Sequence, residues 1–201
     1  METTSTERQS RTNKAGDERR AQIISCSVDA LCELGFAGAT IGEIARRAGV
    51  SKGVVTYHFR DKEALLVAVV SDLYSTVGGL IGDRIDSAES SAQALRGYLE
   101  ANLEYIREQP RRVRAAMEVI ANIRPGIDDP NPIDPVTDHL ASLLRSGQDS
   151  GEFGDFDAQS MAIIIRASID AAARSVVSIP DFDFTAYQHQ LISLALDSTR
   201  R

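Results

Sequence analysis

Residues 40–59 read TIGEIARRAGVSKGVVTYHF and gather the polar side chains best suited to recognition chemistry. Thr40 and Glu43 have the spacing of a capping box at the start of a short helix. Gly49 can end that helix, and Ser51 can cap a second one that starts at Lys52. Two short helices joined by a tight turn predict a helix-turn-helix. The spacing alone leaves an ordinary helical corner as the alternative.

The second short helix carries hydrogen-bond donors and methyl groups near its start. Hydroxyl, imidazole and ammonium groups suit contacts to DNA phosphates, as do the free N–H groups of a helix N-terminus. Methyl groups such as those of Val54 can contact thymine. The candidate DNA-contacting residues in this segment are Ser51, Lys52, Val54, Thr56, Tyr57 and His58. For His58, packing between helices remains the alternative.

Gly35-Phe36, TIGEIARRAGVSKG and YHFRDKEALL together resemble the DNA-binding head of TetR-like transcriptional regulators. The resemblance covers about residues 21–66. The rest of the chain is similar only in its length, its helical pattern and an apolar C-terminal pair of helices. The resemblance implies an all-α fold, with a three-helix DNA-binding head and a helical body that binds a ligand and forms a dimer.

The resemblance also implies roles for individual residues. It implies a phosphate contact for Thr40 and Lys62, contacts to base edges for Lys52, Gly53 and Val54, and packing on the DNA backbone for Tyr57 and His58. Two positions depart from the family pattern. Thr56 stands where an aromatic residue is usual, and Val54 stands where threonine is common. The operator sequence therefore does not carry over from relatives.

The sequence lacks the patterns of an enzyme or a metal site. It shows no nucleophile–base motif, phosphate-binding loop or ligand spacing around His58, His139 or His189. We expect no enzyme activity, no cofactor and no metal. Cys26 and Cys32, six residues apart in one predicted helix, are expected to be reduced thiols in a cytoplasmic protein.

Charge is unevenly distributed over the 201 residues, whose net charge is −7. Residues 1–60 hold nine Lys/Arg and seven Asp/Glu, so the N-terminal part is mildly basic and the remainder is acidic. This pattern favours DNA contact by the N-terminal part only. The longest apolar run is Ala64–Val70, shorter than the ~20 residues that a membrane helix needs. We therefore expect no membrane partner.

Apolar residues spaced three and four apart predict about nine helices and no strands. We expect a flexible basic arm at residues 1–16, a helix-turn-helix domain at 17–60 and a ligand-binding and dimerisation domain at 61–201. The arm and the helix after it carry Arg8, Arg11, Lys14, Arg19 and Arg20, which track phosphates unless this segment is simply solvated.

Three glycines, Gly78, Gly79 and Gly82, are expected to loosen or kink the fourth helix. Four prolines between 125 and 135 predict a loop.

The predicted body offers an effector site and a dimer interface. A stripe with Tyr98 and Asn102, faced by Met117 and Ile120, and the pair Arg166 and Asp170 are the candidate ligand residues, with a structural role as the alternative. Acidic residues on these helices (Glu100, Glu104, Glu118 and Asp170) suggest a lipophilic or cationic effector. Segment 158–178 and the helix after Pro180 are apolar nearly all round, which predicts a homodimer through the two C-terminal helices or a larger single-chain core.

Together these features predict a ligand-responsive transcriptional regulator of the repressor type. It would bind a pseudo-palindromic operator in double-stranded DNA as a dimer, and a small molecule would release it. The alternative is a helical small-molecule-binding protein of the same fold that no longer binds DNA.

Overall fold

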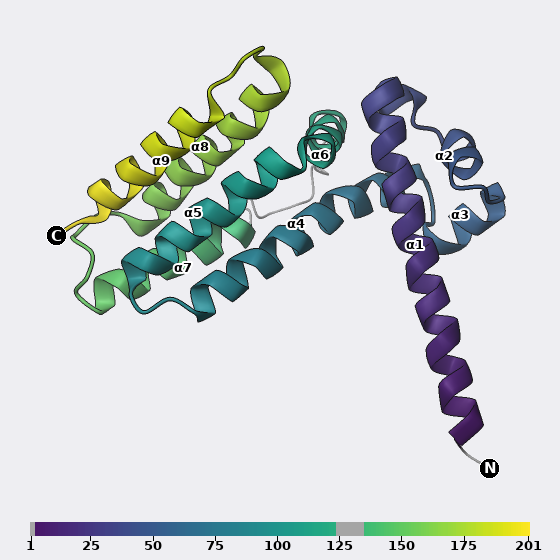
Figure 1. Ribbon diagram of the computed structural model, residues 1–201, viewed down its shortest axis with the longest axis horizontal. Coiled ribbons are helices and arrows are strands. Elements are labelled where there is room, and N and C mark those ends of the chain that lie inside the picture. The colour runs from purple at the N-terminus through teal and green to yellow at the C-terminus, as the bar shows by residue number, and fades with distance from the viewer. Residues whose placement is uncertain (1–2, 124–134) are drawn as a thin grey trace. The chain divides into compact units, whose positions relative to one another are not determined.

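The computed structural model describes residues 3–123 and 135–201, with side chains from residue 14 onward and, after the gap, from residue 136. These ranges form nine α-helices and contain no strand apart from an isolated bridge between Phe153 and Arg200. The all-α prediction is confirmed (Figure 1). The helices are α1 (Thr3–Gly38), α2 (Ile41–Arg47), α3 (Lys52–His58), α4 (Lys62–Asp86), α5 (Ser91–Glu108), α6 (Pro110–Asn122), α7 (Pro135–Asp149), α8 (Ala158–Ser178) and α9 (Phe184–Thr199).

Two compact units divide the chain. One comprises Met1–Leu73 with Ala115–Arg124, and the other comprises Tyr74–Arg114 with Pro125–Arg201. The first unit extends beyond the division expected at residue 60, because α4 and α6 each contribute to both units. Leu65 and Leu66 of α4 and Val119 of α6 are fully or almost fully buried in the core of the first unit, which explains the wider boundary.

The first unit is built around α1 to α3. Ile23, Ile24 and Leu31 of α1 pack with Ile44 of α2 and Val55 of α3, and the structure buries all five. Burying a large aliphatic side chain stabilises a fold by about 1.5–3 kcal/mol. This core fixes α2 and α3 against α1, so the outer faces of the two short helices are held in place.

The long helix α4 runs without interruption from Lys62 to Asp86, across all three glycines. The expected kink is therefore absent. Its length and composition are those of a helix able to cross a membrane. However, Leu65, Leu66 and Val69 lie in the core of the first unit, as expected of a core helix. A Cβ added at Gly78, Gly79 or Gly82 would meet no atom within 4 Å, so packing does not demand glycine there.

The second unit is organised around α5. This helix contacts α7, α8 and α9, and α8 also contacts α7 and α9. Tyr98, Leu99 and Leu103 of α5 are fully buried, as is Leu144 of α7. Figure 1 shows α8 and α9 running side by side. Ile163, Ile164 and Leu194 on these two helices are more than half exposed, although neighbouring positions are buried.

Two expectations about irregular segments have different outcomes. Residues 1–16 were expected to form a flexible arm, and from Thr3 onward they are the first turns of α1. Thr is the commonest residue type in this stretch and Ser is also frequent, so intrinsic propensity favours a helix only weakly, but extending an existing helix costs less than starting one. The helical geometry of α1 breaks at Gly35, with φ 68° and ψ −177°. The proline-rich stretch after residue 124 lies outside the described residues up to Pro135, which begins α7.

Candidate nucleic-acid interface and ligand cavity

The turn between α2 and α3 is set by hydrogen bonds that the sequence predicted. The hydroxyl of Thr40 accepts from the Glu43 N–H at 3.2 Å, and the hydroxyl of Ser51 accepts from the Val54 N–H at 3.3 Å. Gly49 has φ 63°, a left-handed conformation that favours glycine. The N–H of Val50 then bonds back to the Ala45 carbonyl at 3.0 Å, as at a glycine-terminated helix end. These contacts fix the start of α3.

The outer face of α3 is exposed along its length. Ser51, Lys52, Gly53, Thr56 and Tyr57 are exposed, and the side chain of Tyr57 is 86% exposed. Val54 and His58 are half-buried, and Val54 packs partly against the core. The Tyr57 ring therefore contributes nothing to the core, and its contact is edge-on with the His58 ring at a centroid distance of 5.3 Å.

Lys52 lies against the N-terminus of α2. A Cβ built at Gly42 would stand 2.9 Å from Lys52 Cε, 3.3 Å from its Nζ and 3.9 Å from Thr40 Oγ1. Glycine at position 42 therefore leaves room for the Lys52 side chain beside the first turn of α2. Gly42 was not singled out from the sequence, because this contact joins two different helices.

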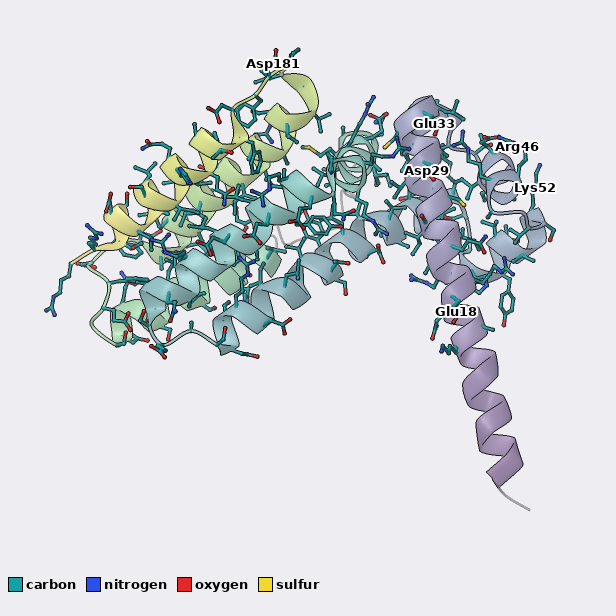
Figure 2. All side chains as sticks on the ribbon, viewed as in Figure 1. Glu18, Asp29, Glu33, Arg46, Lys52 and Asp181 are labelled. Atoms are coloured by element: carbon teal, nitrogen blue, oxygen red, sulfur yellow. The ribbon has the colours of Figure 1, made fainter. Side chains whose placement is uncertain are left out.

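The two arginines of α2 are paired with acidic residues. Glu43 bonds Arg46 at 2.7 Å and Arg47 at 2.7 Å, and Glu33 bonds Arg47 at 2.8 Å. Hydrogen bonds from Arg46 and then Arg47 lower the pKa of Glu43 to about 2. Figure 2 shows Arg46 and Lys52 on the side of α2 and α3 that faces away from α1. Because Arg46 is paired, Lys52 is the more available cation of the two.

Lys62 and Arg20 have partners inside the first unit. The ammonium of Lys62 donates to the Phe36 carbonyl at 2.6 Å and lies 4.5 Å from the centre of the Phe36 ring. The guanidinium of Arg20 lies 5.2 Å from the ring centre of Phe59. Each cation therefore supports the fold. For Lys62, the phosphate contact that the resemblance implied stays a prediction, because the bond to Phe36 uses one of the three ammonium donors.

A cavity of about 350 Å³ opens in the second unit between α4, α5, α7 and α8. Most of its wall is apolar, and the polar groups are concentrated on one side. Asn102 donates to the Tyr98 carbonyl at 2.8 Å and accepts from Arg166 Nη1 at 3.3 Å. The lining residues are Tyr74, Val77, Gly78, Ile81, Gly82, Tyr98, Asn102, Val136, His139 and Arg166.

Three of the six expected ligand residues line this cavity, namely Tyr98, Asn102 and Arg166. Asp170 is not in the wall but contacts Arg166 Nη2 at 3.3 Å. Met117 and Ile120 were expected to face Tyr98, but they belong to the first compact unit and do not line the cavity. The reason is that α6 passes from one unit to the other between Arg114 and Ala115.

The acidic residues that suggested a cationic effector also lie elsewhere. Glu104 and Glu100 pair with Arg84, and Glu100 pairs with Arg96 as well. Glu118 accepts from the Phe36 N–H in the first unit. None of these carboxylates lines the cavity, so their earlier interpretation as effector ligands is corrected.

The cavity wall on α4 was not identified from the sequence, although the spacing of its residues indicates one helix face. Tyr74, Val77, Gly78, Ile81 and Gly82 follow the three- and four-residue spacing of one helix face. The glycines were interpreted as a hinge, which hid this stripe. Val136 of α7 begins an apolar spacing that continues at Leu140 and Leu144, whereas His139 is a single polar residue with no periodicity to reveal it.

Comparison with known proteins agrees with this architecture. Residues 23–69 match the family model described as bacterial regulatory proteins, tetR family. The chain is 42% identical over 84 residues to the HTH-type transcriptional regulator BetI of Escherichia coli, which is 39% of this chain and 43% of the relative. A second E. coli BetI, from strain UMN026, is 38% identical over 88 residues. The match thus spans less than half the length of these curated relatives.

Solved structures match over most of the chain. The structure titled as a fatty acid degradation regulator, FadR, from Bacillus halodurans superposes with a TM-score of 0.74 at 19% identity, covering 89% of this chain and 94% of that one. A tetR-family regulatory protein from Rhodococcus RHA1 gives a TM-score of 0.71 at 18% identity, covering 90% and 97%. At these identities the likeness shows the shared fold.

Proposed function

We propose that the chain is a DNA-binding transcriptional regulator of the TetR type, acting as a repressor in the cytoplasm, and the match of residues 23–69 to the tetR family model supports this proposal. The observation that carries the proposal is the outer face of α3. There, the 86% exposed Tyr57 lies beside exposed hydroxyl and ammonium groups, on a helix whose start is fixed by a left-handed glycine turn. Such a face suits the major groove and its flanking phosphates.

The proposed DNA surface comprises eight of the nine residues expected from the sequence. Lys52, Gly53, Val54 and Thr56 are placed to contact base edges, since they occupy the first turns of α3. The remaining members, assigned to phosphates and the DNA backbone, are Thr40, Ser51, Tyr57 and His58. The hydroxyl of Thr56 donates to the Lys52 or Gly53 carbonyl, which leaves its oxygen to accept from a base.

The regulator is proposed to act as a homodimer through α8 and α9. Ile163 and Ile164 are 52% and 58% exposed, and Leu194 is 55% exposed, on the two helices that were expected to meet a partner. A two-fold pairing of this face covers all of them on both copies. A two-fold dimer with one recognition helix in each copy reads two half-sites about 34–36 Å apart, which requires a pseudo-palindromic operator.

The cavity of the second unit is the proposed effector site. A molecule that binds there more tightly in a conformation unable to hold DNA shifts the population away from the DNA-bound form. Moving that balance from 1:99 to 99:1 takes about 5.5 kcal/mol of differential binding. Tyr98, Asn102 and Arg166 supply the polar contacts, and α4 supplies most of the apolar wall.

Titration against the DNA upstream of the protein's own reading frame, at two salt concentrations, tests the proposal. We expect saturable binding to a two-fold-related site with an excess over random DNA, and sedimentation of the free protein as a dimer. Ile164→Arg should yield a monomer that loses operator affinity, whereas the exposed-site control Val67→Arg should remain dimeric. In the contrary case, the upstream DNA binds no better than random DNA, and a genome-wide selection of bound fragments also finds no preferred fragment. This pair of results would favour a small-molecule-binding protein that no longer recognises DNA.

A further inference from the structure

A buried arginine lies in the wall of the effector cavity. Arg166 is 7% exposed and forms part of the lining, together with the aromatic and aliphatic side chains of α4 and α5. Arginine is rarely buried unless its charge is compensated, because removing a charge from water is costly. The groups that compensate this charge therefore indicate which ligand the cavity accepts.

Among the described residues, the compensation of this charge is incomplete. Asp170 is the acidic partner of Arg166, but its side chain is 50% exposed and its oxygen lies 3.3 Å from Nη2, a long contact for a charged pair. The other hydrogen-bond partners are neutral, namely the Asn102 carbonyl oxygen at 3.3 Å and the Tyr98 phenol. A guanidinium has five N–H donors, so these three partners leave donors for another acceptor.

The described cavity wall contains no carboxylate. Its charged or titratable members are Arg166 and His139, the phenols of Tyr74 and Tyr98 aside, and Asn102 adds a neutral amide. A cationic ligand would meet a like charge in a water-poor site, where repulsion is strong. An anionic group would meet a planar donor suited to binding both oxygens of a carboxylate.

We propose that the effector is a monocarboxylic acid with an apolar body, whose carboxylate binds Arg166 and Asn102 while its apolar part lies along Val77, Gly78 and Ile81. The inference rests on the proposed effector role of the cavity, and it replaces the cationic ligand expected from the sequence. One buried cation matches one negative charge. A volume of about 350 Å³ fits a small ligand with a single acid group.

Calorimetric titration of the purified full-length protein with three probes of equal chain length tests the inference. The probes are octanoate, octan-1-ol and octylammonium. We expect octanoate to bind at least about tenfold more tightly than the alcohol, as a charge-assisted hydrogen-bonded pair provides, and octylammonium to bind more weakly than both. Equal or tighter binding of the ammonium, or no binding of any probe, would overturn the inference.

Variants of the arginine isolate its part. Arg166→Gln should reduce the preference for acid over alcohol to within about twofold, while octan-1-ol still binds. Arg174→Gln, an exposed position on the same helix, should keep the full preference. A preference that survives Arg166→Gln contradicts the proposal.

Because Arg166 is buried, its substitution can also disturb folding, and the native protein provides an independent readout. The ¹³C-carboxyl signal of labelled octanoate should show that the bound acid stays ionised below the pH at which the free acid is protonated. Protonation at the same pH in both states would contradict contact with Arg166. These probes need no DNA. A preference for octanoate without operator binding would therefore overturn the proposed DNA-binding function but support the proposed ligand class. Operator binding without a preference for octanoate would support the function and overturn the ligand class.

Discussion

The Glu118 carboxylate accepts a hydrogen bond from the backbone N–H of Phe36 at 3.0 Å, joining residues 82 apart in the chain. Phe36 follows Gly35, where α1 loses helical geometry. The carbonyl of Phe36 accepts from Lys62. One carboxylate and one ammonium thus satisfy the backbone N–H and the backbone carbonyl of one residue near the end of α1, and Glu118 thereby joins α6 to α1 within the first unit.

Glu118→Ala removes the acceptor for the Phe36 N–H. We expect the free energy of unfolding to fall by about 1–2 kcal/mol, since a half-buried N–H loses a charged partner. Chemical denaturation followed by circular dichroism measures the change. The exposed Glu89→Ala provides the comparison and should lie within about 0.5 kcal/mol of the native protein. Equal stability of the two variants would mean that water accepts the hydrogen bond of the Phe36 N–H as favourably as Glu118 does.

Lys62→Met keeps the aliphatic stem of the side chain and removes the ammonium. We expect a loss of about 1–2 kcal/mol in stability, from the bond to the Phe36 carbonyl and the contact with its ring. The slope of log affinity for DNA against log salt should stay unchanged. A salt slope reduced by about one in the variant would instead support the phosphate contact that the resemblance implied for Lys62.

Tyr57→Ala should weaken binding to operator and random DNA alike while leaving the melting temperature within the scatter of surface variants. The ring is 86% exposed and belongs to no core, so its removal costs the fold little. Fluorescence anisotropy with both DNAs provides the measurement, and Val67→Ala, which also truncates an exposed apolar side chain, serves as control. Loss of preference at one base pair with unchanged overall affinity would identify Tyr57 as a base-reading residue.

Glu43 should make the stability of the first unit depend on pH. Its pKa in the folded protein is about 2, below the ordinary value of 4.5, because Arg46 and Arg47 bond the carboxylate. The stabilisation is present above pH 4.5 and is lost as the pH falls from about 4.5 towards 2. The melting temperature of Glu43→Gln should therefore lie below that of the native protein at pH 7 and approach it near pH 2. A difference in melting temperature that persists at pH 2 would indicate lost packing instead of a lost ion pair. Molar salt should reduce the difference in melting temperature at pH 7, because salt screens the ion pairs.

Gly82→Ala narrows the cavity without a collision, since a Cβ there meets nothing within 4 Å. We expect weaker octanoate binding together with a gain of about 0.5–1 kcal/mol in stability, the usual effect of alanine for glycine in a helix. Gly79→Ala is the matched control, because Gly79 lies on the same helix but outside the cavity wall. It should show the gain in stability and unchanged octanoate affinity. Equal octanoate affinities in the two variants would mean that the bound ligand does not contact position 82.

The first unit could be predicted from the sequence in detail because its signals are local. Thr40, Gly49 and Ser51 determine helix ends through bonds to residues at most five positions away, and the structure has all of them. The cavity depends on α4, α5, α7 and α8 meeting in space, which no local pattern specifies. Tyr98, Asn102 and Arg166 were found because polar groups stand out in apolar stripes. Met117 and Ile120 also lie on an apolar helix stripe, but they belong to the other unit, where Ile120 is 53% exposed.

The glycines of α4 also bear on how this protein can change over generations. Gly78 and Gly82 line the cavity, and the structure has room for a methyl group at each. Glycine and alanine codons differ by one base, so a single mutation can shorten the cavity without a folding penalty. Effector choice is therefore open to selection in small steps. The residues proposed to contact DNA belong to the other compact unit and need not change with the cavity.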